Sequence, residues 1–309
     1  SPPTPAAARS LRNVEAALSI DIGGTKLAAG LVSADGELLG QARAPTAGDD
    51  AEALFATLME VVDQVRSGDE AVCGVGTGGP MAPGGEEVSP LNIPVWRRFP
   101  LRRRIAEATG LATFVDNDAK ALALGEGWVG AAAGVHDFIA MVVSTGVGGG
   151  IVLDGRLLDG AAGNAGHIGH VVVRPDGNAC TCGAQGCLEA EASGTGIRRS
   201  TGLAPEEAGP GMVVHAGTMV GRGVASVANL LDLRLAVVAG SVALGFGEPF
   251  FAAAQAELAR RARLEFSAGA RIVPGALGWH GPLVGAGAVG WRGLGHDVLA
   301  PGRGGGSVD

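Results

Sequence analysis

Lysine is scarce in this sequence, and acidic residues outnumber basic ones. Only Lys26 and Lys120 are lysines, and the formal net charge is −8. This balance argues against a nucleic-acid binder that works by charge alone. It leaves a nucleotide ligand open, because backbone N–H groups hold phosphates with little help from lysine.

Long apolar runs are also missing. No run reaches the ~18–20 residues that a membrane span needs. The first stretch, SPPTPAAARSLRN, has no apolar signal-peptide core and is predicted to be a loose tail. Hydrophobic residues nevertheless make up 47% of the chain, which is enough for a large core and excludes a disordered protein.

Cysteine is rare, yet three of the four cysteines lie within eight residues: Cys180, Cys182 and Cys187. This is the spacing of metal ligands rather than of a disulfide framework, so a reducing, cytoplasmic setting is predicted. Glycine is abundant, with 54 residues. The glycines have no three-residue period, which excludes collagen, and their clusters predict tight turns and close backbone approaches.

Two stretches share one pattern, residues 16–46 and residues 137–160. Each has an apolar strand, a glycine-rich turn, a second strand and a further turn into a third, which predicts an antiparallel meander. The repetition predicts two related halves with a cleft between them. We place a smaller α/β domain at 15–116 and a larger one at 117–294, with tails at 1–14 and 295–309.

Further elements follow from apolar periodicity and turn residues. Strands are predicted at 71–76, 112–115 and 233–242, and helices at 50–66, 101–109, 116–130, 217–232 and 249–266. Asn117 or Asp118 is suited to cap the third of these helices.

The stretch DIGGTK, from Asp21 to Lys26, joins the first two strands. Its glycines, Gly23 and Gly24, allow backbone N–H groups to point at an anion. Thr25 adds a hydroxyl and Lys26 a charge, while Asp21 can hold a magnesium ion directly or through water. An ordinary hairpin turn is the alternative interpretation.

The stretch STGVGGG, from Ser144 to Gly150, resembles a dinucleotide fingerprint at first sight. That fingerprint requires a helix directly after the glycines, whereas IVLDGRLL follows here and predicts a strand. The Walker A pattern is absent too, because leucine follows Lys26. The sequence therefore predicts two phosphate-binding hairpins, one in each half.

Several motifs together resemble a known family. Paired hairpins and the late strand turn VVAGSV are similar to the actin–hexokinase–chaperone ATPase fold. DIGGTK, DNDAKALALGE, STGVGGGIVLDGRLLDGAAGNAGHIGH and CTCGAQGCLEAEASG resemble the ROK family of bacterial sugar kinases and sugar-responsive repressors, over about residues 18–294. The resemblance implies a two-domain actin-like ATPase (ribonuclease H-like) α/β fold with an interdomain cleft and a structural zinc loop.

Three thiolates need a fourth ligand to complete a tetrahedral site. His170 is the best candidate, and the family resemblance implies the same residue. Cys180, Cys182, Cys187 and His170 would form a closed structural zinc site, which braces the loop and does no chemistry. The alternative is three reduced, metal-free thiols, whose density would make them prone to oxidation.

The resemblance also implies a sugar kinase that uses ATP with magnesium. Asp118 would accept the proton of the sugar hydroxyl, since it follows a strand and opens a helix; a helix cap alone is the alternative. By resemblance the sugar would contact Gly79, with Gly78 beside it, and the side chains of Asn92, Asn117, His170 and Glu189. Glu189 by itself is typical of a surface acid on a helix.

Phosphates and adenine are assigned on the same basis. The ATP-binding residues would be Asp21, Gly23, Gly24, Thr25, Lys26, Ser144, Thr145, Gly146, Gly148, Gly240 and Ser241. The adenine would lie over the turn from Gly240 to Val242, because a glycine turn at a strand end leaves room for a flat base.

His167 marks a departure from the commonest family pattern, which is GEIGH where this chain has GHIGH. A neutral imidazole both donates and accepts, but it lacks a second carboxylate oxygen. The same GHIGH occurs in bacterial N-acetylmannosamine kinases. The 6-hydroxyl of glucose is our first expectation, with N-acetylmannosamine or N-acetylglucosamine as the alternative; segment 195–220 also looks shortened relative to the family.

Other classes remain as alternatives. A sugar-responsive repressor would need an N-terminal DNA-binding domain, for which we expect no room before the first strand. A non-catalytic sugar binder would not need both glycine turns and Asp118. Binding polyphosphate in place of ATP would require a basic groove, and the arginines near residues 101–105 are weak evidence for one. A dimer or tetramer is expected, with no nucleic-acid or membrane partner.

Overall fold

The computed structural model describes residues 15–300, which divide into two compact units. The first unit contains residues 15–118 and Pro282–Val298, and the second contains Ala119–Gly281 with residues 299–300. The predicted tail at 1–14 and the end of the predicted tail at 295–309 lie outside the described residues. No helix within 15–300 has the length and apolarity to cross a bilayer.

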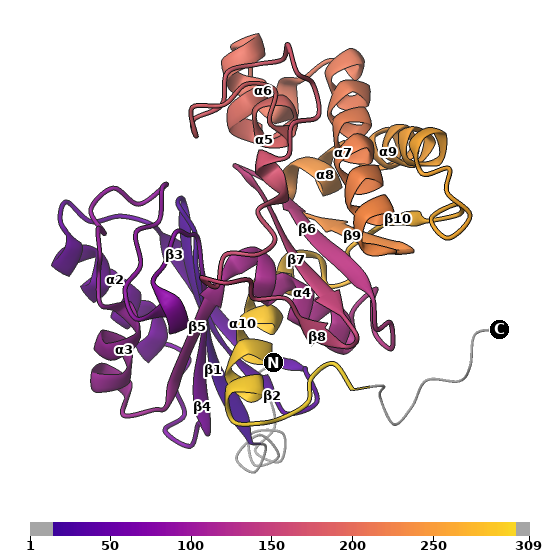
Figure 1. The fold of residues 1–309 in the computed structure, drawn as a ribbon. Helices are drawn as coiled ribbons and strands as arrows, with labels where there is room; N and C mark the ends of the chain where they lie inside the picture. Colours follow the sequence, from indigo (N-terminus) through magenta and orange to yellow (C-terminus); the bar gives the residue numbers. More distant parts are fainter. Residues whose placement is uncertain (1–14, 301–309) are drawn as a thin grey trace, which may run out of the picture. The chain divides into compact units, whose positions relative to one another are not determined.

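The first unit is built on a five-stranded sheet with the order β3-β2-β1-β4-β5 (Figure 1). The strands are β1 (Ala16–Ile22), β2 (Lys26–Ser33), β3 (Leu38–Pro45), β4 (Val72–Thr77) and β5 (Thr113–Asn117). β1, β2 and β3 form an antiparallel meander, while β1, β4 and β5 run parallel. The predicted first meander is confirmed.

Helices cover both faces of this sheet. α2 (Ala51–Asp63) and α3 (Leu101–Thr109) share a core with Cys73 and Val75 of β4, on the face opposite α10 (Gly281–Gly293) (Figure 1). Gly74 lies between those two residues and faces the other way, because side chains alternate along a strand. A Cβ there would clash with the backbone of Ala286 in α10, so glycine is what lets the helix approach.

The second unit repeats the topology, with the order β10-β9-β6-β7-β8. Its strands are β6 (Phe138–Val143), β7 (Val147–Leu153), β8 (Arg156–Leu157), β9 (Leu235–Ala239) and β10 (Arg271–Pro274). β6, β7 and β8 form the second meander, and β9 and β10 continue the sheet in parallel with β6. The predicted repetition is therefore confirmed in topology as well as in sequence.

The second unit also carries helices on both faces. Its helices are α4 (Asp118–Val129), α5 (Leu188–Ala192), α6 (Gly194–Thr201), α7 (Pro210–Leu231), α8 (Ser241–Phe246) and α9 (Glu248–Arg261). α7 and α9 cover the core face that includes Ile151, whereas α4 lies against Gly148 and Gly150 on the opposite face. A Cβ on Gly150 would lie 2.6 Å from that of Ala123, so this run of glycines permits close helix packing.

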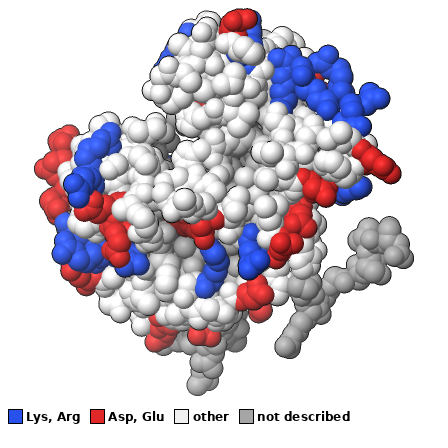
Figure 2. Space-filling view, viewed as in Figure 1, with Lys and Arg blue, Asp and Glu red and all other residues white. Residues whose placement is uncertain are grey.

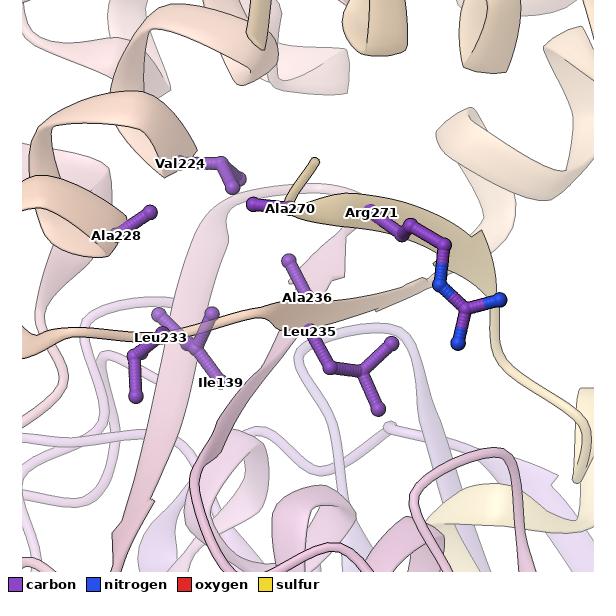
Figure 3. A pocket seen from close by; sticks show the side chains of 8 residues that line it. All are labelled: Ile139, Val224, Ala228, Leu233, Leu235, Ala236, Ala270 and Arg271. Atoms are coloured by element: carbon purple, nitrogen blue, oxygen red, sulfur yellow. The ribbon is translucent and has the colours of Figure 1, made fainter. Parts of the chain in front are cut away.

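A small gap lies under α7, next to β9 and β10 (Figure 3). It is lined by Ile139, Val224, Ala228, Leu233, Leu235, Ala236, Ala270 and Arg271. Because the lining is aliphatic apart from the exposed Arg271, it offers too few hydrogen-bonding groups for a sugar. We interpret the gap as a packing feature of the second core.

The arginines of α3 lie close to acidic residues. Arg102 pairs with Glu86, Arg103 lies 4.0 Å from Glu107, and Arg104 lies 2.7 Å from Glu52. In Figure 2 blue and red side chains alternate over the α2 and α3 region of the first unit. The arginines near residues 101–105 are therefore engaged by acids and do not form a basic groove.

A second group of arginines lies over the end of α9, where Figure 2 shows blue side chains together. Glu257 of α9 pairs with Arg222 of α7 at 2.7 Å and with Arg260 and Arg261 of its own helix. Burial alone would raise the pKa of Glu257, but hydrogen bonds from these arginines outweigh it and lower the pKa to about 2. The group ties α7 to α9.

Candidate functional site

In the first unit the candidate residues gather at one edge of the sheet. β1, β4 and β5 are parallel neighbours, so their carboxyl ends meet at the same edge. Asp21 lies near the end of β1, Gly78 and Gly79 follow β4, and Asn117 ends β5 directly before Asp118. Residues from three separate motifs therefore meet here.

The turn between β1 and β2 is held by its own backbone and by Thr46. The Gly23 N–H donates to the Lys26 carbonyl at 2.9 Å, and the Thr46 hydroxyl donates to the Gly23 carbonyl at 2.7 Å. The Thr46 N–H also donates to the Thr25 carbonyl at 3.1 Å. Gly24 and Thr25 are exposed at its tip, where their N–H groups can meet a ligand.

Asp21 lies in a strongly perturbed environment. Asp21 is buried, with 9% of its surface exposed to solvent. Burial, and next the negative charge of Asp118, raise the pKa of Asp21 to about 7, although Lys26 opposes this. A carboxylate whose pKa is raised by burial and by a second nearby carboxylate favours a divalent cation beside it, so the donor set fits magnesium.

Asn92 lies against the tip of this turn. A Cβ on Gly24 would come within 2.5 Å of the Asn92 Cβ, so the glycine makes room for the asparagine. The Leu91 N–H donates to the Gly79 carbonyl at 3.2 Å. A Cβ on Gly79 would in turn lie 3.7 Å from the Asn117 amide nitrogen. The first unit thus brings together Asp21, Gly24, Gly79, Asn92, Asn117 and Asp118.

In the second unit a matching edge forms around the turn between β6 and β7. The Ser144 N–H donates to the Gly146 carbonyl at 2.9 Å, which closes the turn. The Glu189 carboxylate of α5 accepts the Val147 N–H at 2.9 Å, and a Cβ on Gly146 would lie 2.7 Å from it. Glu189 is therefore not a free surface acid but is fixed beside the glycine turn.

The adjoining strand and helices also contact this turn. The Ser144 and Ser241 hydroxyls lie 2.9 Å apart, which brings the end of β9 to the end of β6. A Cβ on Gly240 would clash with the Val143 backbone, so glycine permits this approach. The N–H groups of Gly194 and Thr195 donate to the carbonyls of Ser144 and Thr145 at 2.8 and 3.1 Å. The sequence reasoning missed these two residues, although the SG pair after Glu191 is a helix-start signal.

The segment GHIGH lies along β7. Gly166 and Gly169 both face the β7 backbone, where a Cβ would clash with the carbonyls of Gly149 and Val147. His167 Nδ1 lies 2.9 Å from the Asn164 carbonyl, and a carbonyl only accepts. Nδ1 therefore carries the proton, and in the neutral ring Nε2 is left as an acceptor.

Gly148 differs from the other glycines assigned to ATP. It lies within β7, paired with Val142, and a Cβ there would be 3.0 Å from that of Ala119 in α4. Its observed contacts are those of helix packing. Gly148 therefore has a packing contact that the glycine run in the sequence does not reveal.

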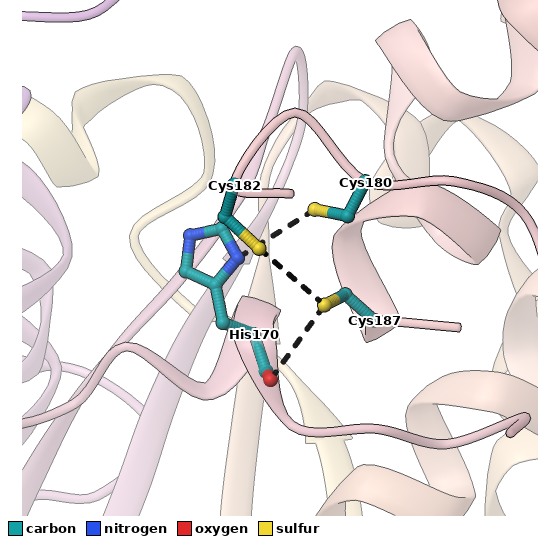
Figure 4. Close-up of side chains that lie close together, drawn as sticks. All are labelled: His170, Cys180, Cys182 and Cys187. Atoms are coloured by element: carbon teal, nitrogen blue, oxygen red, sulfur yellow. Dashed lines mark hydrogen bonds between the residues drawn. The ribbon is translucent and has the colours of Figure 1, made fainter. Parts of the chain in front are cut away.

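The predicted metal ligands converge (Figure 4). Within residues 15–300 the ligand atoms of His170, Cys180, Cys182 and Cys187 all lie within 4.8 Å of one another. Cys182 Sγ lies 3.8 Å from Cys187 Sγ, and His170 Nδ1 lies 3.7 Å from Cys180 Sγ. Tetrahedral zinc with Zn–S of about 2.3 Å places its sulfurs about 3.8 Å apart, so the geometry fits zinc.

The chemical environment of the thiols also fits a bound cation. Burial, and next the two neighbouring thiols, raise the pKa of Cys187 to about 12. The Ala184 N–H, and next the neighbouring thiols, lower the pKa of Cys182, which is exposed. A divalent cation bound here would stabilise all three thiolates at once.

Comparison with known proteins places the chain in a family. The model of the ROK family matches residues 17–290. A glucokinase of Thermotoga maritima is 41% identical over 186 residues, 59% of this chain and 58% of that protein. An N-acetylmannosamine kinase of Citrobacter koseri is 37% identical over 246 residues, 74% of this chain and 84% of that protein. The match thus spans 58% of the length of the glucokinase.

Two solved structures agree over more of the chain. The ROK hexokinase from Thermus thermophilus has a TM-score of 0.79 and 33% identity, covering 91% of this chain and 99% of that one. A ROK family glucokinase from Streptomyces griseus, in complex with glucose and AMPPNP, has a TM-score of 0.79 and 30% identity, covering 90% and 99%.

The repeated sheet topology and the two similar structures together define the fold of this chain. It is the α/β, two-domain actin-like ATPase fold, with a cysteine cluster that fits a zinc loop. More narrowly, the chain belongs to the ROK family.

Proposed function

We propose that the protein is an ATP-dependent sugar kinase that transfers the γ-phosphate to the 6-hydroxyl of a hexose. One observation carries the proposal: Asp118 opens a helix at the sheet edge where Asp21, Gly24, Asn92 and Asn117 also lie. This edge combines a positioned base, a phosphate-suited turn and polar side chains for hydroxyl groups, as phosphoryl transfer needs. The named activities of the relatives agree with it.

Each residue has a defined part in the proposed reaction. Asp118 accepts the proton of the attacking hydroxyl, and Asn92 and Asn117 hydrogen-bond the sugar. The turn residues Gly23, Gly24, Thr25 and Lys26 bind phosphate oxygens. Asp21 would hold a magnesium ion, which supplies charge neutralisation on the phosphates when bound.

The second unit carries a further set of candidate binding groups. Ser144, Thr145 and Gly146 would bind phosphate through the second turn, and Gly240 and Ser241 would lie beside the adenine. Glu189, His167 and His170 would contact the sugar. His170 would also ligate zinc with Cys180, Cys182 and Cys187, which fixes the loop before α5 and takes no part in the transfer.

Glucose is the first substrate we propose. The second is an N-acetylated hexosamine, such as N-acetylmannosamine, with which His167 is compatible. With Nε2 as an acceptor, His167 suits an acetamido N–H as well as a hydroxyl. The relatives carry both names, at 41% and 37% identity.

The test is a panel of sugars given to purified protein with ATP and magnesium. ADP release is measured with glucose, mannose, N-acetylglucosamine and N-acetylmannosamine. Sugar-dependent ADP release with one of these supports the kinase and identifies its substrate class. ADP release that is absent with every sugar would contradict it and favour a sugar-responsive regulator.

Polyphosphate as donor is less favoured, because Arg102 and Arg104 are paired with acids. Running the same panel with polyphosphate in place of ATP tests this. A cytoplasmic location and a dimer or tetramer remain predictions, and sedimentation of the purified protein tests the second.

A further inference from the structure

Arg97 makes an unusual set of contacts in the loop that carries Asn92. Its Nη1 lies 2.9 Å from the Pro90 carbonyl, 3.1 Å from that of Ile93 and 2.7 Å from that of Trp96. One guanidinium nitrogen has only two hydrogens, so the three carbonyls share them. The loop from 90 to 96 is thus folded around a single cationic nitrogen.

The rest of the loop is anchored at its two ends. The Leu91 N–H donates to the Gly79 carbonyl at 3.2 Å, which ties the start of the loop to the end of β4. Trp96 stacks on Phe99 with ring centroids 4.6 Å apart, and its indole N–H donates to the Ala51 carbonyl at 3.2 Å. Asn92 itself is exposed, so the backbone around it sets its place.

The position of Asn92 is tightly limited on its other side. A Cβ built on Gly24 would lie only 2.5 Å from the Cβ of Asn92, so there is little space between the loop and the glycine turn. A loop that relaxed outward would move the Asn92 amide away from the sheet edge that holds Asp118. Arg97 supplies charge-assisted hydrogen bonds that oppose such a movement.

We propose that Arg97 is a positioning residue for sugar binding, which acts by holding the Asn92 loop against the glycine turn of the first unit. The inference rests on the proposed sugar kinase function. Arg97 does not need to touch the sugar, the nucleotide or the reacting atoms. Its contribution is to the affinity for the sugar, not to the transfer step.

Its neighbour provides a matched control. Arg98 is also exposed, but its side chain pairs with Glu87 at 2.8 Å and donates to none of the three loop carbonyls. Both variants remove one exposed arginine from the same loop. Only Arg97→Ala removes the shared donor.

The experiment measures KM for the sugar and for ATP, together with kcat, in the variants Arg97→Ala, Arg97→Lys and Arg98→Ala. Arg97→Ala is expected to raise the sugar KM about tenfold, with KM for ATP and kcat within about threefold of wild type. Arg97→Lys should recover most of the loss, because an ammonium has three donors. Arg98→Ala should match wild type.

A double-mutant cycle with Asn92→Ala tests whether Arg97 acts through Asn92. In the Asn92→Ala background, Arg97→Ala should change the sugar KM by less than about twofold. Independent, multiplicative effects would overturn the inference, as would a wild-type sugar KM in Arg97→Ala. Urea unfolding of Arg97→Ala separates general destabilisation from the KM effect.

Failure of the proposed function has a different signature. If the wild-type protein phosphorylates no sugar, both the kinase proposal and this inference are wrong. If the wild type is active and Arg97→Ala has an unchanged sugar KM, only the role of Arg97 is wrong.

Discussion

The glycine turns after β1 and after β6 lie at the same place in two sheets of the same topology. The acidic side chains beside the two turns, however, come from different kinds of element. In the first unit Asp21 is part of the strand itself, and the charge of Asp118 acts on it. In the second unit the strand has no acid at the turn, and Glu189 is delivered from α5 to the Val147 N–H.

This difference gives a physical reason for the zinc site that we propose beside the second turn. The first turn takes its acids from β1 and from the first residue after β5, positions that the sheet holds in place. The second takes its acid from a five-residue helix that begins right after Cys187. A short helix is marginal alone, and the proposed zinc site before it would supply rigidity.

The largest predicted effect is therefore loss of the metal from the second unit. Cys182→Ser should release zinc and unfold this region, because structural zinc contributes roughly 10–16 kcal/mol and a whole domain is stable by only about 5–15 kcal/mol. Zinc content and the circular dichroism melt measure the effect. Cys73→Ala, in the first unit, is the control and should keep its zinc; a stable, zinc-free Cys182→Ser protein would show that the loop needs no metal.

The second largest predicted effect concerns Glu189, the acid beside the second turn. Glu189→Gln keeps the shape of the side chain but weakens its hydrogen bonds, so kcat/KM for the sugar should fall about 10- to 100-fold. Steady-state kinetics measure it, with the exposed Glu206→Gln as control. Unchanged kcat/KM would mean that Glu189 only fixes the turn.

The third effect is the pH dependence of the first unit. Asp21 has a pKa of about 7 when folded, above its ordinary 3.8, so the folded state binds this proton more tightly. Without magnesium, the free energy of unfolding should fall as pH rises from about 4 to 7, by at most about 1.4 kcal/mol per pH unit from this group. Urea unfolding across this range should show a smaller fall in Asp21→Asn; equal slopes would refute the shift.

The smallest predicted effect tests a feature of both sheets, the close packing of a helix against a strand glycine. Gly150→Ala should destabilise the protein by about 1–3 kcal/mol, because the new Cβ would press on α4. Gly74→Ala should act in the same direction in the first unit, under α10. Gly40→Ala is the control, since nothing lies within 4 Å of its added Cβ; equal urea midpoints for all three would contradict the packing argument.

Much of this fold was predictable because the signals are local. The meanders show alternation and turn residues over short stretches, and α3 has the predicted bounds, Leu101–Thr109. The metal ligands Cys180, Cys182 and Cys187 show their chemistry through spacing. Most of the motif residues at the two turns could be named because several motifs resemble one family.

Long-range packing was not predictable in the same way. The sequence reasoning treats 117–294 as one continuous domain, whereas α10 returns to the first unit and packs on Gly74. Nothing local to Gly74 indicates a partner more than two hundred residues away. Likewise Gly148 looks like a phosphate-binding glycine in sequence, and only the position of Ala119 above it shows a packing contact.

The central claim is that Asp118 takes the proton of a sugar hydroxyl during phosphoryl transfer. The most direct measurement compares Asp118→Asn with wild type and with the exposed Asp35→Asn, using ATP, magnesium and the sugar that the panel identifies. We predict that kcat falls by about 10²–10⁴ in Asp118→Asn alone, while the calorimetric Kd for the sugar stays within about threefold. A kcat near that of wild type would contradict the account.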